Sequence, residues 1–474
     1  MKQMLPHATP ESLGIPSAAL EQFYKEIEVR KMPMHSFMLL RHGKIATQGW
    51  WAPHHEDEQH IIYSVSKSFT SIAVGLCIEE GRFTLDSRVV DFFPEKIDFD
   101  VHPDVATMTV RNLLTMTSGH HYATDRSKPD WVKTFLMTPP EYKPGTLFGY
   151  DSTATHTLCA IVQKVTGMKM MDYLKPRLFD PLGIEDIYCQ ECPMGINAGS
   201  RGIHCRTLDM AKFGQLVLQK GVWKGKQLIP SHWIEEATKK QVDTSTKGTK
   251  IDGNRGYGYQ FWRLRDDAFA GIGSGGQLIV MIPSADMVWV STANLLNDEG
   301  DYELIVRLFW ATIFPFLSDE PLPENPMAHA ALIARAQALQ MLLPDGQPHS
   351  PIEPLIDGKC YRFDPNQAQI ETISFAQQAD GYVITVHIGG KDWVIHAGRE
   401  TWIAQHVPVT NDDGWARYTF VDDHTMVCQV QLALKLGTYK FVMAFLGDTL
   451  NVQLRPTGWT DFHRINLLAC GVAQ

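Results

Sequence analysis

The first 315 residues place strand-like segments at both ends and helix-like segments in the middle. Strand-like runs are predicted on either side of a His42-Gly43-Lys44 turn, and again at 257–262, 278–282 and 287–291. From about 85 to 240, helix-like segments are interrupted by Pro and Gly. One antiparallel sheet flanked by helices, with an inserted all-helical subdomain, produces this order. We therefore expect an α+β fold for this part of the chain.

The character of the sequence changes after residue 343. A helix predicted at 328–343 ends at Pro344, and 344–356 has the Pro-rich, polar composition of a linker. Beyond it, short strands are predicted at 381–387, 392–396, 417–421, 426–433 and 439–445. Regularly spaced short strands are typical of a small antiparallel barrel or sandwich. We predict a first domain at 1–343, a linker at 344–356 and a small all-β, barrel-like domain at 357–474.

Composition and charge exclude several classes of protein. The chain has 474 residues, 44% of them hydrophobic, which is enough for full hydrophobic cores. Its 43 Lys and Arg against 53 Asp and Glu give a net charge of −10, which argues against nucleic acid or an anionic membrane as a partner. The eight cysteines follow no regular spacing, no run approaches the roughly 18 apolar residues of a membrane span, and the N-terminal sequence lacks the apolar region of a signal peptide. We expect a soluble, cytoplasmic protein.

A single Ser-x-x-Lys tetrapeptide, Ser64-Val-Ser-Lys67, opens a predicted amphipathic helix at 64–80. Residues three apart share a helix face, so the hydroxyl and the amine are expected to lie side by side. A lysine buried among apolar residues can lose its proton and act as a base for the serine. Free N–H groups at the start of the helix suit a developing oxyanion. The tetrapeptide therefore predicts nucleophilic catalysis by Ser64.

Tyr150 lies in a loop before another predicted helix. A tyrosine there can relay a proton when a nearby cation lowers the pKa of its phenol. It can equally be a packing residue, and the sequence leaves both roles open.

Gly271, Gly273 and Gly276 match the spacing G-x-G-x-x-G. A dinucleotide site needs a helix after these glycines to direct N–H groups at pyrophosphate, whereas 278–282 is strand-like. We therefore exclude a dinucleotide site and expect the glycines to let the backbone approach a substrate closely.

Several stretches together resemble the serine β-lactamase and penicillin-binding protein superfamily, most closely its class C-like branch of esterases, D-aminopeptidases and β-lactamase-related serine hydrolases. These stretches are 39–44 with 48–51, 63–71, 110–119, 179–184 and 209–215. The resemblance covers about residues 9 to 315. It implies a β-lactamase/transpeptidase-like fold and a site without cofactor or metal.

The resemblance also implies roles for individual residues. Ser64 would be the acylated nucleophile, Lys67 its general-base partner, and Tyr150 the tyrosine of the family's Tyr-x-Asn element. The backbone N–H groups of Ser64 and Ser274 would form the oxyanion hole. The residues that would contact the substrate are Ser152, Gly271, Gly273 and His120.

Two departures from the family pattern bear on the substrate. Ser152 replaces the asparagine of Tyr-x-Asn, and Gly271 replaces the lysine of Lys-Thr-Gly, which grips the carboxylate of penicillins and D-Ala-D-Ala peptides. We therefore predict cleavage of an ester or amide, in a small molecule or short peptide, through a Ser64 acyl-enzyme. Two alternatives stay open: a true β-lactamase or D-Ala-D-Ala-type peptidase in which Arg201 or Lys247 supplies the cation, and a non-catalytic ligand-sensing module.

Two further clusters and the C-terminal region each have two interpretations. The soft ligands Cys189, Cys192, His204 and Cys205 form a zinc site or are unpaired thiols. The histidines His54, His55 and His60 lie in a solvated loop or on the rim of a substrate cleft. By the resemblance, the C-terminal region caps the cleft or mediates homo-oligomer formation.

Overall fold

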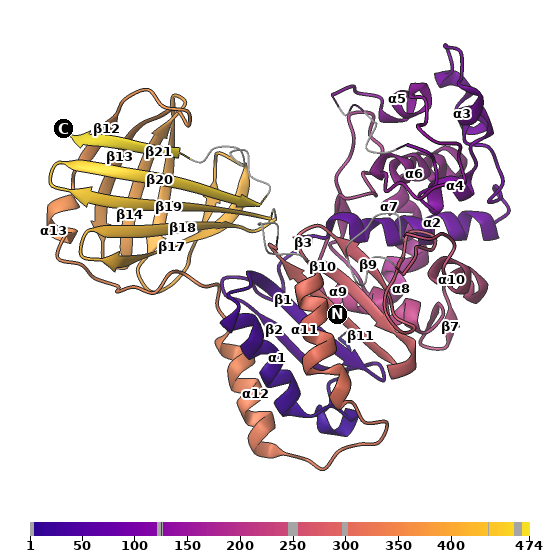
Figure 1. The fold of residues 1–474 in the computed structure, drawn as a ribbon, viewed down its shortest axis with the longest axis horizontal. Helices are drawn as coiled ribbons and strands as arrows, with labels where there is room; N and C mark the ends of the chain where they lie inside the picture. Colours follow the sequence, from indigo (N-terminus) through magenta and orange to yellow (C-terminus); the bar gives the residue numbers. More distant parts are fainter. Residues whose placement is uncertain are drawn as a thin grey trace.

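The computed structural model describes residues 4–120, 125, 127–244, 255–295, 302–434, 436–458 and 467–474. Figure 1 shows a β barrel on one side of the molecule and a helix-covered sheet on the other, with a group of helices beyond the sheet. Among the described residues, none of the helices combines the length and the apolar character needed to cross a bilayer.

The central sheet has six antiparallel strands in the order β2-β1-β11-β10-β9-β8. Their bounds are β1 Met34–Arg41, β2 Lys44–Trp50, β8 Trp262–Arg263, β9 Phe269–Gly273, β10 Gln277–Ile282 and β11 Met287–Ala293. β1 pairs with β11, so that Leu39 faces Trp289 across 250 residues of sequence. The predicted sheet, built from strands at both ends of this region, is confirmed.

Alternate residues of these strands face two layers of helices. One layer consists of α1 Ser17–Val29, α11 Tyr302–Thr312 and α12 Pro326–Ala338, and the other of α2 Ser66–Glu79 and α9 Thr207–Leu218. Trp289 of β11 stacks on Phe309 of α11 with ring centroids 5.1 Å apart. On the opposite face, a Cβ on Gly214 of α9 would lie 2.7 Å from Ile279 and Val288. The sheet is therefore buried on both faces.

The inserted helical subdomain follows α2, as predicted. Its helices are α3 Pro103–Thr107, α4 Val110–Leu114, α5 Trp131–Met137, α6 Ser152–Thr166, α7 Met170–Leu174 and α8 Asp180–Leu182, and α10 Ser231–Thr238 follows α9. Short strands connect them: β3 His60–Ile61 with β5 Ile203–Cys205 and β4 Tyr188–Cys189, and β6 Val222–Trp223 with β7 Lys226–Gln227.

The strand predicted at 257–262 is wrong except at its last residue, because only Trp262 joins the sheet. The chain turns back instead, and Tyr257 bridges Trp262. Within this turn the buried Gln260 has a left-handed φ of 67°. Its amide donates to the carbonyls of Leu113 and Leu114 and accepts from Thr155 at 2.7 Å. Residues 257–261 are therefore buried in a turn that packs between helices α4 and α6.

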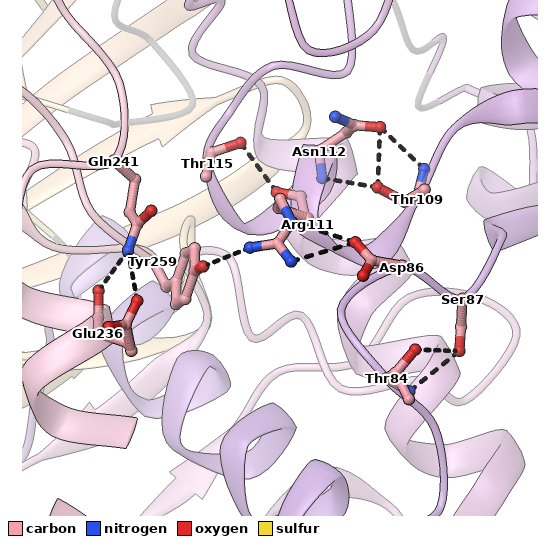
Figure 2. Close-up of polar contacts among 10 residues, drawn as sticks. All are labelled: Thr84, Asp86, Ser87, Thr109, Arg111, Asn112, Thr115, Glu236, Gln241 and Tyr259. Atoms are coloured by element: carbon pink, nitrogen blue, oxygen red, sulfur yellow. Dashed lines mark hydrogen bonds and ion pairs between the residues drawn. The ribbon is translucent and has the colours of Figure 1, made fainter. Parts of the chain in front are cut away.

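Further polar contacts join α4 to the turn before β8 (Figure 2). Arg111 of α4 donates to the hydroxyl of Tyr259 at 3.0 Å and forms an ion pair with Asp86 at 3.1 Å. A planar guanidinium suits this bridging position because it presents several N–H donors in one plane. Arg111 therefore links the helical subdomain to the turn before β8.

The C-terminal region forms a closed nine-stranded barrel, which decides between the predicted barrel and sandwich. The region has ten strands, nine of which form the ring: β12 Cys360–Phe363, β13 Ile370–Gln378, β14 Gly381–Ile388, β15 Lys391–Gly398, β16 Ile403–Val407, β17 Asp412–Asp422, β18 Thr425–Leu432, β19 Gly437–Leu446, β20 Thr449–Gly458 and β21 Leu467–Ala473. Neighbouring strands are antiparallel, and a bridge from Gly398 of β15 to Arg417 of β17 closes the ring, leaving β16 paired outside it. The five predicted strands lie in β14, β15, β17, β18 and β19.

The connection to the barrel differs in two details from the predicted one. α12 ends at Ala338, not at 343, because the next residues extend and pair with Ala52. Helix α13 Glu353–Ile356 lies within the predicted linker, and its Ile356 belongs to the barrel core. The second half of the linker sequence therefore packs as part of the barrel.

A cluster of buried histidines lies beside β1 and β3. His60 donates from Nδ1 to the carbonyl of Ile61, so its Nε2 accepts from His35 Nδ1 at 2.7 Å. The ring of His54 stacks on His35 at 3.9 Å and bonds to Glu58 at 2.8 Å. His54 and His60 are each 4% exposed. The prediction of a solvated loop is therefore wrong for these two residues.

The burial of His60 makes stability depend on pH. Burial lowers the pKa of His60 to about 3, whereas histidine in an unfolded chain titrates near 6.5. Below about pH 6.5 the unfolded chain binds a proton that the native state does not, so the free energy of unfolding falls as the pH falls. We expect His60→Gln to reduce this slope by up to about 1.4 kcal/mol per pH unit, measured by urea unfolding between about pH 7 and pH 5. His55→Gln, at an exposed neighbouring position, is the matched control. A slope equal to that of the unmodified protein in His60→Gln would contradict this account.

Candidate active site

Ser64 lies in the 3-10 turn η2 Tyr63–Val65, directly before α2. α2 begins at Ser66 and is buried continuously from Ser66 to Cys77, because it fills the space between the sheet and the helical subdomain. The prediction of an amphipathic helix starting at Ser64 is therefore wrong. The expectation that Lys67 does not lie on a solvated helix face is confirmed, since the residue is 1% exposed.

The amine of Lys67 is surrounded by three oxygen atoms. Its Nζ lies 3.0 Å from Ser64 Oγ, 3.1 Å from Ser152 Oγ and 2.7 Å from the carbonyl oxygen of Ser200. An ammonium donates to all three of them. A neutral amine donates to two and accepts the Ser64 hydroxyl proton through its lone pair. The geometry therefore suits both states of a base that exchanges a proton with Ser64.

Tyr150 belongs to an aromatic cluster beside this lysine. Its ring centroid lies 4.9 Å from Lys67 Nζ, stacks on Trp262 at 5.6 Å and meets Tyr257 edge-on at 6.3 Å. Burial keeps the pKa of Tyr257 well above its ordinary value, so Tyr257 stays protonated. Tyr150 is therefore a packing residue that also lies beside Lys67, because its ring contacts aromatic neighbours and faces the amine.

Ser152 begins α6, where the preceding Asp151 caps the helix by accepting from the Thr153 N–H at 2.8 Å. The hydroxyl of Ser152 accepts a hydrogen bond from the amine of Lys67. Its contact with substrate stays a prediction. The contact of the Ser200 carbonyl with Lys67 was not predicted from the sequence. A backbone carbonyl leaves no side-chain signature, and the nearest indication is Gly199, where a Cβ would lie 2.5 Å from Cys159 Sγ.

The glycines of β9 let this strand approach η2, the turn that carries Ser64. A Cβ on Gly273 would lie 2.3 Å from the carbonyl oxygen of Ile62, and one on Gly271 would lie 3.0 Å from Ser68 Oγ. The next residue, Ser274, is exposed. This close approach brings the backbone of Ser274 toward the turn that carries Ser64, while the predicted contacts of Gly271 and Gly273 with substrate remain untested.

His120 and Arg201 lie on the helical side of the site. His120 is 1% exposed, and its Nε2 donates to the carbonyl of Thr138 at 2.7 Å, so its side chain packs within the loop. The predicted contact of His120 with substrate stays a prediction. Arg201 follows Ser200, and its guanidinium lies 5.6 Å from the ring of Trp131. Lys247, the other cation considered, lies outside the described residues.

The predicted soft-ligand cluster is dispersed. Within the described part of the chain, no three His, Cys, Asp or Glu side chains come together as a metal site. Burial raises the pKa of the Cys205 thiol well above its ordinary value and also raises that of Cys189, which disfavours the thiolate that zinc needs. The structure therefore gives no support to the zinc interpretation.

An amine buried against a serine hydroxyl, on a helix packed behind an antiparallel sheet, is the arrangement of a serine hydrolase related to the β-lactamases. The comparison with family models agrees. The chain belongs to the Beta-lactamase family, whose model matches residues 20–308 and so spans the sheet and the helical subdomain.

Similar proteins include hydrolases of several kinds. The 6-aminohexanoate-dimer hydrolase of Paenarthrobacter ureafaciens is 25% identical over 313 residues, which are 60% of this chain and 80% of that enzyme. The lovastatin esterase of Penicillium rubens is 27% identical over 161 residues, 28% of this chain and 40% of the esterase. The solved octameric penicillin-binding protein homologue from Pyrococcus abyssi matches 95% of this chain and 99% of its own, with a TM-score of 0.52 and 18% identity, so the shared fold extends into the barrel. The protein is accordingly an enzyme, a β-lactamase-related serine hydrolase.

The contact between Ser152 and Lys67 can be tested directly. Removal of the hydroxyl in Ser152→Ala takes away one of the three oxygens around the amine, worth about 1 kcal/mol, so labelling of Ser64 by a fluorophosphonate should slow about fivefold. Ser152→Thr keeps the hydroxyl and should label at close to the original rate. The measurement is the pseudo-first-order labelling rate. Equal rates in Ser152→Ala and the unmodified protein would show that the contact does not matter for the nucleophile.

Proposed function

We propose that the enzyme cleaves an ester or amide through an acyl-enzyme on Ser64. The observation that carries this proposal is the 3.0 Å contact between Ser64 Oγ and the amine of Lys67, an amine almost fully removed from water. Burial disfavours the charged form of a lysine, so the amine is suited to accept a proton. A serine hydroxyl next to such a base is an activated nucleophile.

The proposed reaction has two halves. Lys67 takes the proton of Ser64 as Oγ attacks the carbonyl carbon, and the negative charge on the carbonyl oxygen is stabilised by the N–H groups of Ser64 and Ser274. The intermediate then collapses, the bond to the leaving group breaks, and a proton from Lys67, relayed by Tyr150, reaches the leaving oxygen or nitrogen. In the second half, water gives a proton to the same base and attacks the acyl-enzyme. The acid is released and Ser64 regains its proton.

A neutral acyl group fits this site best. The family's lysine is Gly271 here, and its α-carbon faces Ser68 instead of carrying a cation. The amide of Tyr-x-Asn is a hydroxyl, which in this structure contacts Lys67. The two relatives above are named a 6-aminohexanoate-dimer hydrolase and a lovastatin esterase, which supports a substrate with a hydrolysable acyl bond. We infer a small molecule or short peptide with an ester or amide bond.

The nucleophile is tested by Ser64→Ala. Loss of the attacking hydroxyl should lower hydrolysis of p-nitrophenyl butyrate by about 10⁴-fold or more, as for the loss of other serine nucleophiles. Intact-mass spectrometry should show one acyl group on the unmodified protein and none on the variant. Ser12→Ala, an exposed serine on the N-terminal segment, is the control and should react normally. Undiminished turnover in Ser64→Ala would exclude the proposal, and an unmodified protein that never becomes acylated would favour a ligand-sensing module.

A true β-lactamase or D-Ala-D-Ala-type peptidase is the second candidate, and Arg201 favours it. Arg201, which is positively charged, is the next residue after Ser200, whose carbonyl oxygen accepts a hydrogen bond from Lys67. If a β-lactam carboxylate binds Arg201, nitrocefin turnover should fall about tenfold in Arg201→Gln, the cost of one charge-assisted hydrogen bond. Because the family's Lys-Thr-Gly lysine is missing, we expect p-nitrophenyl butyrate to be hydrolysed faster than nitrocefin by the unmodified protein. The reverse order, together with a loss in Arg201→Gln, would establish the second candidate.

A further inference from the structure

One turn of the barrel reaches the predicted active site. Figure 1 shows the end of the barrel formed by β18 and β19 beside the end of the sheet near β3 and β10. The backbone N–H of Leu436, just before β19, donates to the hydroxyl of Tyr63, the residue before Ser64. The side chain of Leu436 is fully buried, and its Cδ1 lies 2.4 Å from where a Cβ of Gly275 would be. Leu436 therefore contacts two segments of the site.

The first of these segments is under backbone strain. Tyr63 has a φ of 42°, in the left-handed region that residues with a side chain rarely adopt. Such a conformation costs about 1–3 kcal/mol and persists only where the surroundings fix it. Burial raises the pKa of the Tyr63 phenol to about 12, so this hydroxyl stays protonated and does not act as a base. Its contact with Leu436 anchors the side chain of a residue whose strained backbone presents Ser64.

The second segment is the turn between β9 and β10. Gly275, with a φ of 78°, follows Ser274 directly. Its carbonyl accepts from the N–H of Leu295 at 2.9 Å, and Leu436 covers its α-carbon. A side chain at position 275 would displace Leu436. The barrel therefore makes two contacts next to the site. It packs on Gly275, which follows Ser274, and it bonds to Tyr63, which precedes Ser64.

We propose that Leu436 clamps the two halves of the oxyanion hole, with Leu436 and Tyr63 acting as positioning residues. This inference rests on the proposed function. The two N–H donors lie on segments more than 200 residues apart, and an oxyanion hole works only when both donors point at one oxygen atom. Because Leu436 contacts both segments, it fixes their separation. The barrel is then part of the catalytic apparatus, through contacts that stabilise the transition state more than the bound substrate.

Other contacts keep the barrel in place when Leu436 is changed. Trp415 of β17 lies edge-on to the ring of His54 with centroids 5.5 Å apart. Arg417 donates to the side chain of Gln340 at 3.3 Å. A truncation at Leu436 is therefore expected to loosen the two turns without detaching the barrel.

The test compares Leu436→Ala with Leu436→Met and with Leu446→Ala. Leu446 ends β19 in another turn of the barrel and is 59% exposed, so it is the matched control. Displacement of a catalytic group by a fraction of an ångström costs about tenfold or more in rate, so kcat for p-nitrophenyl butyrate should fall about tenfold in Leu436→Ala. KM and the pH profile should stay unchanged, Leu436→Met should restore the rate, and Leu446→Ala should behave as the unmodified protein.

Tyr63→Phe provides a second, independent variant, because it removes the hydroxyl and keeps the ring. It should lower kcat to a similar extent, and the double variant with Leu436→Ala should lose less than the product of the two effects, since the clamp needs both contacts and is already lost when either one is removed. The clamp is overturned if both single variants acylate at the original rate while the unmodified protein is acylated on Ser64, or if Leu436→Ala raises KM alone. An unmodified protein that is never acylated overturns the proposed function itself, and the clamp with it.

Discussion

The burial of the Lys67 amine is the constraint on which the site depends. Because the whole residue is only 1% exposed, its amine must find oxygen partners inside the protein, and a buried polar group without a partner costs a few kcal/mol. Ser64, Ser152 and Ser200 supply these partners from η2, the start of α6 and the loop before β5. One side chain therefore fixes three segments that are distant in sequence. The surroundings of the amine therefore depend on segments that follow α2, since Ser152 and Ser200 both lie beyond it.

Close backbone packing then decides how Ser64 is positioned. β9 approaches η2 only because Gly271 and Gly273 have no side chain, and a Cβ on Gly273 would collide with the carbonyl of Ile62. Leu436 of the barrel packs against the adjacent turn and bonds to Tyr63. The turn η2 is thus enclosed by the sheet on one side and by the barrel on another. Family membership extends over residues 20–308, yet the surroundings of Ser64 include residues beyond that range.

The charged residues around this site differ from those of the family pattern that the sequence resembles. The strand that carries a lysine in Lys-Thr-Gly carries Gly271 here, which removes a fixed cation from the site. Arg201 carries a positive charge on the helical side, where its guanidinium lies 5.6 Å from the ring of Trp131. Gly271 and Arg201 lie on different elements: Gly271 is on β9, and Arg201 follows Ser200 in the loop before β5. The Ser–Lys pair of the family pattern is therefore present in this chain, while the lysine of Lys-Thr-Gly is absent from β9.

The sequence determined the α+β order, five strands of the barrel (β14, β15, β17, β18 and β19) and the residues of the Ser64–Lys67 pair, because hydrophobic periodicity and a three-residue spacing act locally. Tertiary structure decided what depends on distant contacts. The apolar run at 257–262 became a turn because Gln260 bonds to helices far away in sequence, and His54 and His60 became buried because β1 packs beside them. The Ser200 carbonyl and the barrel contact at Leu436 left no pattern, since a backbone group looks alike at every position until the fold brings it to a partner.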